Sequence, residues 1–261
     1  MIAVIIGGCA RSGTSLLLSL LSCHPRLYCY PVESQAFCAR SYGAPLSEES
    51  RARSELEHEI SKVEMRADIQ AWCEKTPKNV MHFSELLVRF GGDVRLIHIV
   101  RDGRDVVTSV HPKAPEACWV SPERWKNDVE AGLKHAMHDQ VLTLRYEDLI
   151  RDSERVMRRV CSFVGLDYGP WFRSYPVTAK IVAADAWPQP AVALHDHSID
   201  RWKNSVWRHR AMKLEADPEA RRLLLRLGYY LSLSASEIPN GLEIGLPHEA
   251  NVKDDLPQRR A

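Results

Sequence analysis

Residues 2–22, IAVIIGGCARSGTSLLLSLLS, contain the pattern that decides the fold. A short run of mostly β-branched residues leads into a glycine-rich turn, and the turn opens directly into a leucine-rich segment. This order is typical of a phosphate-binding loop, in which backbone N–H groups and the first turn of a helix stabilise an anion. The stretch therefore predicts a buried strand, an anion-binding loop and a helix in immediate succession.

The loop departs at one position from the nucleotide-triphosphatase pattern G-x-x-x-x-G-K-[ST], because Thr14 stands where that pattern has lysine. The basic residue lies inside the loop instead, at Arg11, where it would place a fixed charge on a phosphate or on a transferred group. Gly13 lets the backbone curve closely around an anion, and Ser12, Thr14 and Ser15 add hydroxyl donors. The loop therefore indicates a nucleotide whose terminal group is not a γ-phosphate; a tight turn without a ligand is the alternative.

The composition is that of an ordinary globular protein, with 45% hydrophobic and 26% charged residues among 261. We expect one domain over residues 1–235, because no linker interrupts it, and a loosely ordered tail over residues 236–261. A net charge of +1 predicts neither a nucleic-acid partner nor insertion into an anionic membrane, so any anion site is local. Seven cysteines without a C-x-x-C pair, and the lack of a signal-peptide pattern, favour a cytoplasmic location.

Apolar strand patterns alternate with helical patterns along the chain. The predicted strands are residues 2–7, 28–30, 71–74, 94–100 and 141–144. The predicted helices are residues 14–23, 47–66, 79–90, 104–110, 121–138, 147–164 and 219–231. Such alternation implies an α/β fold, a P-loop-like three-layer sandwich in which helices flank a central, mainly parallel sheet.

Polar loops follow four of the predicted strands directly. These loops are residues 8–14, 74–78, 101–105 and 145–147. Ligands of parallel sheets bind beyond the carboxyl ends of the strands, so we expect the four loops to converge on one edge and form a single site.

Residues 101–109, RDGRDVVTS, follow the clearest central strand. Arg101 ends that strand, and Ser109 lies about two helical turns further along. An arginine at a strand end together with a helix hydroxyl makes a second phosphate clamp. A solvated, salt-bridged turn is the alternative interpretation.

Four blocks of the sequence stand in a characteristic order and spacing. They are Arg11-Ser12-Gly13-Thr14 with the later His24-Pro25, Val100-Arg101-Asp102-Gly103-Arg104 with Ser109, Arg145-Tyr146-Glu147-Asp148-Leu149, and Phe163-Val164-Gly165-Leu166. Together they resemble the sulfotransferases that use 3′-phosphoadenosine 5′-phosphosulfate (PAPS). The resemblance covers residues 2–168, with a fainter match at Arg201-Trp202, and is closer to the tyrosylprotein and carbohydrate sulfotransferases than to the phenol and steroid enzymes.

The resemblance implies donor-binding roles for several residues. The loop over residues 11–15 would hold the 5′-phosphosulfate end of PAPS. Arg101 and Ser109 would hold the 3′-phosphate, the group that distinguishes PAPS from ATP. Tyr146 would approach the nucleotide, and Arg201 would close a C-terminal lid over the 3′-phosphate.

The resemblance also implies two catalytic side chains besides Arg11. Glu33 lies close to where the tyrosylprotein and carbohydrate branch carries its glutamate, and it would be the base that takes the acceptor's proton. Lys75, in the sequence EKTPKN, matches the family's lysine before a proline turn and would stabilise the bridging oxygen of the leaving nucleotide. Lys78 is the alternative candidate for the lysine. The alternative interpretation of Glu33 and of either lysine is an exposed surface residue without a catalytic role.

These residues predict in-line transfer of a sulfuryl group to a hydroxyl acceptor, with arginine, lysine and backbone N–H groups supplying the positive field and no metal required. We expect the acceptor to be a small molecule, a sugar, a lipid or a peptide. Two other functions stay open at this point: a P-loop small-molecule kinase that uses ATP and Mg²⁺, and a non-catalytic nucleotide-binding module.

Overall fold

The computed structural model describes residues 1–38, 51–111, 114–182 and 192–232. A five-stranded sheet, parallel throughout, runs through them in the order β2-β3-β1-β4-β7. Its strands are β1 (Ile2–Gly7), β2 (Leu27–Cys29), β3 (Ala71–Lys75), β4 (Val94–Val100) and β7 (Val141–Arg145). Because β1 lies between β3 and β4, the loop that follows it emerges at the middle of the carboxyl edge.

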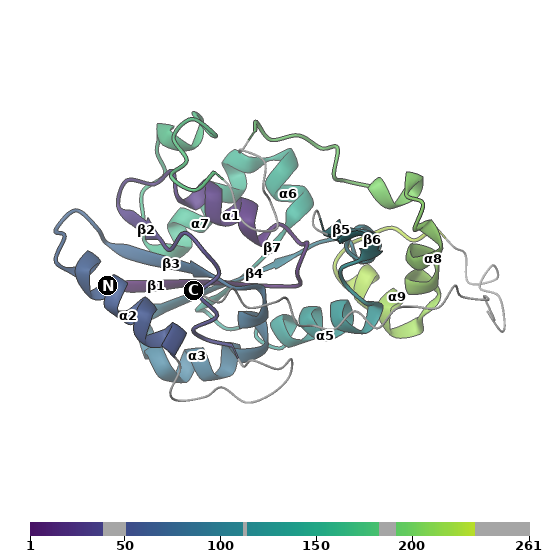
Figure 1. Cartoon of the computed structure of the whole chain (residues 1–261), viewed down its shortest axis with the longest axis horizontal. Helices are drawn as coiled ribbons and strands as arrows, with labels where there is room; N and C mark the ends of the chain where they lie inside the picture. The colour runs from purple at the N-terminus through teal and green to yellow at the C-terminus, as the bar shows by residue number, and fades with distance from the viewer. Residues whose placement is uncertain (39–50, 112–113, 183–191, 233–261) are drawn as a thin grey trace. The chain divides into compact units, whose positions relative to one another are not determined.

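Helices cover both faces of the sheet. The described helices are α1 (Thr14–Leu21), α2 (Arg51–Glu64), α3 (Phe83–Phe90), α4 (Gly103–Val107), α5 (Pro122–Leu133), α6 (Tyr146–Arg151), α7 (Ser153–Val164), α8 (Arg208–Ala216) and α9 (Pro218–Arg226). Figure 1 shows α1, α6 and α7 on one face and α2, α3 and α5 on the other. The predicted α/β sandwich with a parallel central sheet is confirmed.

The central strand is apolar on both sides because two helical layers pack on it. Ile6 lies in one buried cluster with Leu17 of α1. Its neighbour Ile5, which points the opposite way, lies in another cluster with Leu86 of α3. The β-branched run that opens the sequence therefore contributes to both cores of the sandwich.

Two predicted helices, over residues 79–90 and 147–164, are not single α-helices. Residues 79–82 belong to the 3₁₀ helix η1 (Pro77–His82), and α3 begins at Phe83. Residues 147–164 form α6 and α7, which are separated by Asp152. The backbone of Asp152 leaves the helical region (φ −143°), and its carboxylate accepts the N–H of Arg155 at 3.2 Å. Asp152 thus ends one helix and caps the next, because an Asx side chain competes with the helical hydrogen bonds of its own backbone.

Other elements were not predicted from the sequence. These are a short antiparallel pair, β5 (Val110–His111) and β6 (Ala114–Cys118), helix α8, and the 3₁₀ helices η1 (Pro77–His82), η2 (Gly91–Asp93), η3 (Pro170–Phe172) and η4 (Arg201–Asn204). The first four residues of the predicted helix 47–66 lie outside the described residues.

Residues Met1–Leu231 form one compact unit. The single domain over residues 1–235 stays a prediction, and the predicted tail lies outside the described residues. None of the described helices combines the length and the apolar surface that crossing a membrane requires.

Gly13 fixes the geometry at which the first loop enters α1. Its backbone is left-handed (φ 94°), and a Cβ atom there would lie 2.5 Å from Cδ2 of Tyr146. Both facts select glycine, because an L side chain resists this conformation and the aromatic ring fills the space.

We expect Gly13→Ala to destabilise the protein through strain and overpacking by about 2 kcal/mol or more, which lowers Tm by roughly 5 °C in a chain of this size. Gly92→Ala is the matched control, because no atom lies within 4 Å of the added methyl group. Thermal melts of the two variants measure the difference. Equal Tm values would show that the loop tolerates a side chain at residue 13.

Candidate active site

The loops that follow four strands of the sheet meet at its carboxyl edge. The N–H of Gly8 donates to the carbonyl oxygen of Pro77 at 3.0 Å, which joins the loops after β1 and β3. Arg101, after β4, donates from Nη1 to the carbonyl oxygen of Arg11 at 2.9 Å. The guanidinium of Arg101 also lies 4.5 Å from the ring centre of Tyr146, which follows β7. The expected convergence is therefore found.

Lys75 and Glu33 form an ion pair beside the first loop. Nζ of Lys75 lies 2.6 Å from Oε1 of Glu33 and donates to Oγ of Ser15 at 3.1 Å. The lysine side chain is 2% exposed and the glutamate side chain is 41% exposed. A buried ammonium group thus contacts the start of α1, while the carboxylate beside it remains open to solvent. Lys75, rather than the alternative Lys78, makes these contacts.

Glu74 is a buried carboxylate that the sequence analysis missed. Its Oε1 accepts hydrogen bonds from the hydroxyls of Ser34 (2.8 Å) and Thr76 (2.6 Å), and its Oε2 accepts one from Nδ2 of Asn79 (2.7 Å). Burial raises the pKa of Glu74, and the hydrogen bonds oppose this rise. Glu74 thus ties the residue next to Glu33 to the end of β3. A charged residue within an otherwise buried strand was the signal available in the sequence.

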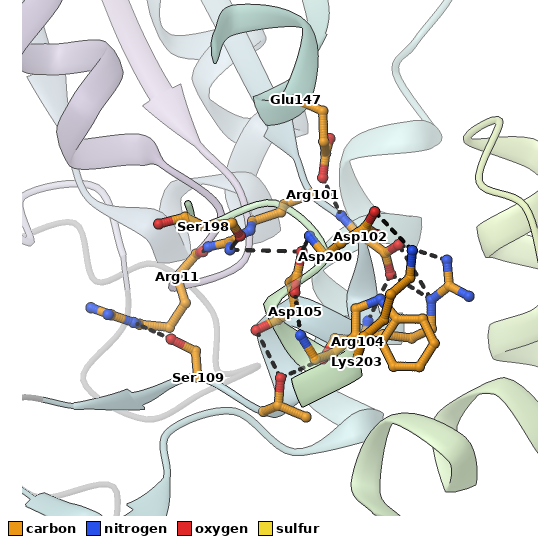
Figure 2. Close-up of polar contacts among 12 residues, drawn as sticks. Arg11, Arg101, Asp102, Arg104, Asp105, Ser109, Glu147, Ser198, Asp200 and Lys203 are labelled. Atoms are coloured by element: carbon orange, nitrogen blue, oxygen red, sulfur yellow. Dashed lines mark hydrogen bonds and ion pairs between the residues drawn. The ribbon is translucent and has the colours of Figure 1, made fainter. Parts of the chain in front are cut away.

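Arg11 lies in a cluster of positive charge. Its backbone is left-handed (φ 69°), and its Nε donates to Oγ of Ser109 at 3.0 Å (Figure 2). Burial lowers the pKa of Arg11, and the charges of Arg101 and Arg201 lower it further. Arg101 and Arg201 therefore each repel Arg11, and an anion bound beside Arg11 would relieve that repulsion.

The residues after β4 form a buried network, not the solvated turn that was the alternative. Arg101, Asp102, Arg104 and Asp105 are all at most 8% exposed. Asp102 caps α4 by accepting the N–H of Arg104 at 2.9 Å and pairs with its guanidinium at 2.7 Å. Arg104 also pairs with Glu215 of α8 at 2.8 Å. Charges at this depth are retained because each has a partner.

Asp105 and Arg101 bind the segment over residues 198–204. The carboxylate of Asp105 accepts the N–H of Asp200 and the N–H of Trp202, each at 2.9 Å. Arg101 donates from Nη2 to the carbonyl oxygen of Ser198. These contacts, visible in Figure 2, connect the loop after β4 to a segment about a hundred residues further along the chain.

The remaining predicted site residues differ in how deeply they are buried. Ser12 is fully buried, and its hydroxyl has no hydrogen-bond partner among the described residues. Thr14 is buried as the first residue of α1. Arg201 is exposed at the start of η4, and its charge acts on Arg11. The structure thus brings the loop, Lys75, Glu33, Ser109 and the arginines to one edge.

Residues 3–170 match the profile of the Sulfotransferase family. The match covers well over half of the chain and includes the loop, the Lys75–Glu33 pair and the charged residues 101–105 that follow β4. The chain belongs to the sulfotransferase family. The tyrosylprotein and carbohydrate branch stays a prediction.

Solved structures of three sulfotransferases have a similar fold. The sulfotransferase domain of the curacin biosynthetic pathway has a TM-score of 0.63 and 17% identity, over 88% of this chain and 98% of that one. A sulfotransferase from Alicyclobacillus acidocaldarius has a TM-score of 0.54 and 18% identity, over 89% and 98% of the two chains. A mouse sulfotransferase complexed with PAP has a TM-score of 0.51 and 14% identity, over 87% of each chain. No curated protein sequence matches the chain.

The network after β4 extends beyond the family match. Its partners Ser198, Asp200, Trp202 and Glu215 all lie outside residues 3–170. The C-terminal part of the sulfotransferase is therefore attached to the rest of the fold by buried polar contacts of Arg101, Arg104 and Asp105, in addition to the apolar packing of α8 and α9 on α4 and α5.

Burial gives Asp105 a pH-dependent effect on stability. It raises the pKa of Asp105 to about 6, although the charge of Arg101 opposes the rise. Since the ordinary pKa is 3.8, the folded state binds this proton more tightly than the unfolded state does. The contribution of the protonated Asp105 to stability is therefore lost as pH rises from about 4 through about 6.

We therefore expect the Tm of the wild type minus that of Asp105→Asn to increase as pH falls from about 8 to about 4.5. Thermal melts of both proteins over this range measure the difference, and subtraction removes the titration of all other groups. A constant difference would contradict a raised pKa at Asp105.

Proposed function

We propose that the sulfotransferase moves a sulfuryl group from PAPS to a hydroxyl acceptor, with Glu33 as the base. The observation that carries this proposal is the contact of Lys75 with both Glu33 (2.6 Å) and Ser15 (3.1 Å) at the end of the anion-binding loop. A proton acceptor and a cation thereby lie together beside the proposed phosphate-binding site. A module that only binds a nucleotide needs neither.

The donor is assigned from the charges and from one neighbour. The mouse sulfotransferase of similar fold is complexed with PAP, which is PAPS without its sulfuryl group. In this chain the backbone N–H groups and hydroxyls of residues 11–15 would hold the 5′-phosphosulfate at the start of α1. The cluster of Arg101, Ser109 and Arg201 would hold the 3′-phosphate, and the ring of Tyr146 would face the nucleotide.

Transfer then follows from positioning and charge. The acceptor oxygen forms a bond to sulfur as the bond between sulfur and the bridging oxygen of the nucleotide breaks. Glu33 takes the proton of the acceptor hydroxyl, and Lys75 donates a hydrogen bond to the bridging oxygen, on which negative charge develops. Arg11 stabilises the charge on the transferred group. In this proposal arginine, lysine and backbone N–H groups supply the positive field without a metal.

The acceptor belongs, in this proposal, to the hydroxyl-bearing small molecules, sugars, lipids or peptides. The exposure of the Glu33 carboxylate supports an acceptor that approaches from solvent. We also propose that residues 1–235 act as a single domain in the cytoplasm, and that the enzyme belongs with the tyrosylprotein and carbohydrate sulfotransferases, which use a glutamate base.

PAP is expected to stabilise the protein by about 3 kcal/mol at a concentration a hundredfold above its dissociation constant, which raises Tm by roughly 5–10 °C. Thermal-shift measurements with PAP, and separately with ATP and Mg²⁺, give the comparison. A rise with ATP and Mg²⁺ but none with PAP would favour the P-loop kinase and overturn the proposal.

Glu33→Gln is expected to reduce kcat by about 10²–10⁴ while PAP binding is kept, because the amide cannot accept the proton. Glu64→Gln is the matched control, since Glu64 is an exposed glutamate at the end of α2. Transfer of labelled sulfate from PAPS to p-nitrophenol, a tyrosine peptide, a hexosamine oligosaccharide and a fatty alcohol supplies the assay. Unchanged kcat with intact PAP binding would remove Glu33 from the mechanism.

A further inference from the structure

Asp105 holds the backbone on both sides of Arg201. Its two carboxylate oxygens accept the N–H of Asp200 and the N–H of Trp202, each at 2.9 Å. The side chain of Asp105 is 1% exposed, whereas Arg201 between the two bonded residues is exposed. A buried anion thus fixes the backbone from which a cation projects.

We propose that Asp105 is a positioning residue that aims Arg201 at the 3′-phosphate and so sets the preference for a 3′-phosphorylated nucleotide. The inference rests on the proposed function, which gives Arg201 that phosphate as its ligand. Asp105 itself contacts no nucleotide in this account and acts only through the turn that it holds.

The backbone around Arg201 needs an external restraint. Asp200 adopts a left-handed conformation (φ 61°), which is uncommon for a residue other than glycine. Such a conformation persists where the surrounding structure over-determines it. Asp105 supplies two of the restraints, and Arg101 supplies a third at Ser198.

Electrostatic repulsion makes the restraint necessary for binding. The charges of Arg101 and Arg201 both lower the pKa of Arg11, so Arg201 lies within the field of Arg11. Without an anion between them, these like charges favour a position of Arg201 further out in solvent. The hydrogen bonds to Asp105 oppose this displacement before the nucleotide binds. They thereby preorganise Arg201 for the phosphate.

The two aspartates of the network have different roles. Asp102 accepts the N–H of Arg104 and pairs with its guanidinium, so it stabilises α4 itself. The carboxylate of Asp105 is directed at the segment over residues 198–204 instead (Figure 2). Removing the carboxylate of Asp105 should therefore alter this segment more than the helix that carries it.

The test compares PAP with AMP, which lacks the 3′-phosphate, by calorimetric titration of four proteins: the wild type, Asp105→Asn, Arg201→Ala and the double variant. We expect Asp105→Asn to weaken PAP binding by about tenfold and to leave AMP binding within about twofold, since only the 3′-phosphate interaction is lost. In the Arg201→Ala background the same substitution should add little, because Asp105 acts through Arg201. Asp217→Asn, which removes an aspartate cap from α9, is the control and should leave both affinities unchanged.

Amide hydrogen exchange supplies a readout that needs no nucleotide. The amides of Asp200 and Trp202 should exchange faster in Asp105→Asn, whereas the amides of α5 should not. If Asp105→Asn fails to fold, the same measurements are made on Asp105→Glu, which keeps the charge but lengthens the side chain. The same weakening of PAP binding and the same faster amide exchange are expected. Equal weakening of PAP and AMP, full additivity with Arg201→Ala, or unchanged exchange would each overturn the inference. A wild type that binds AMP as tightly as PAP would instead refute the proposed donor.

Discussion

The hydrogen bond from Arg101 to the carbonyl oxygen of Arg11, at 2.9 Å, is the contact on which the site depends. It holds the loop after β1 against the loop after β4, and the other end of the same guanidinium reaches Ser198. Three segments that are distant in the sequence are thereby joined by one planar cation with several donors, which is the geometry for which arginine is suited. The carboxyl edge of the sheet becomes an anion site because this contact keeps Arg11 and Ser109 together.

Buried carboxylates keep the cations in place. Glu74 binds the residue next to Glu33, Asp102 binds Arg104, and Asp105 binds the backbone that flanks Arg201. These carboxylates explain how a chain with a net charge of +1 gathers arginines at one point without a large global charge. The cost of burying them is offset by hydrogen bonds to almost every oxygen.

The sequence was sufficient where local patterns decide structure. A β-branched run, a glycine-rich loop and a leucine-rich helix predicted β1, α1 and the loop between them. The strand ends predicted that Lys75, Arg101 and Tyr146 lie at one edge of the sheet. It was insufficient where tertiary contacts decide. Nothing in the local pattern shows that Asp105 accepts two N–H groups almost a hundred residues away, or that Glu74 is buried and binds Ser34 beside Glu33. The split between α6 and α7 depends on one aspartate cap at Asp152, which periodicity alone cannot detect.

The central claim is that the loop over residues 11–15 holds the 5′ end of a nucleotide whose 3′-phosphate lies among Arg101, Ser109 and Arg201. A crystal structure of the protein with PAP tests it most directly. We expect the 5′-phosphate at the N-terminus of α1, within hydrogen-bond distance of Ser15 and Lys75, and the 3′-phosphate beside Ser109 and Arg201. PAP bound in the reverse orientation, or bound away from the carboxyl edge of the sheet, would contradict it.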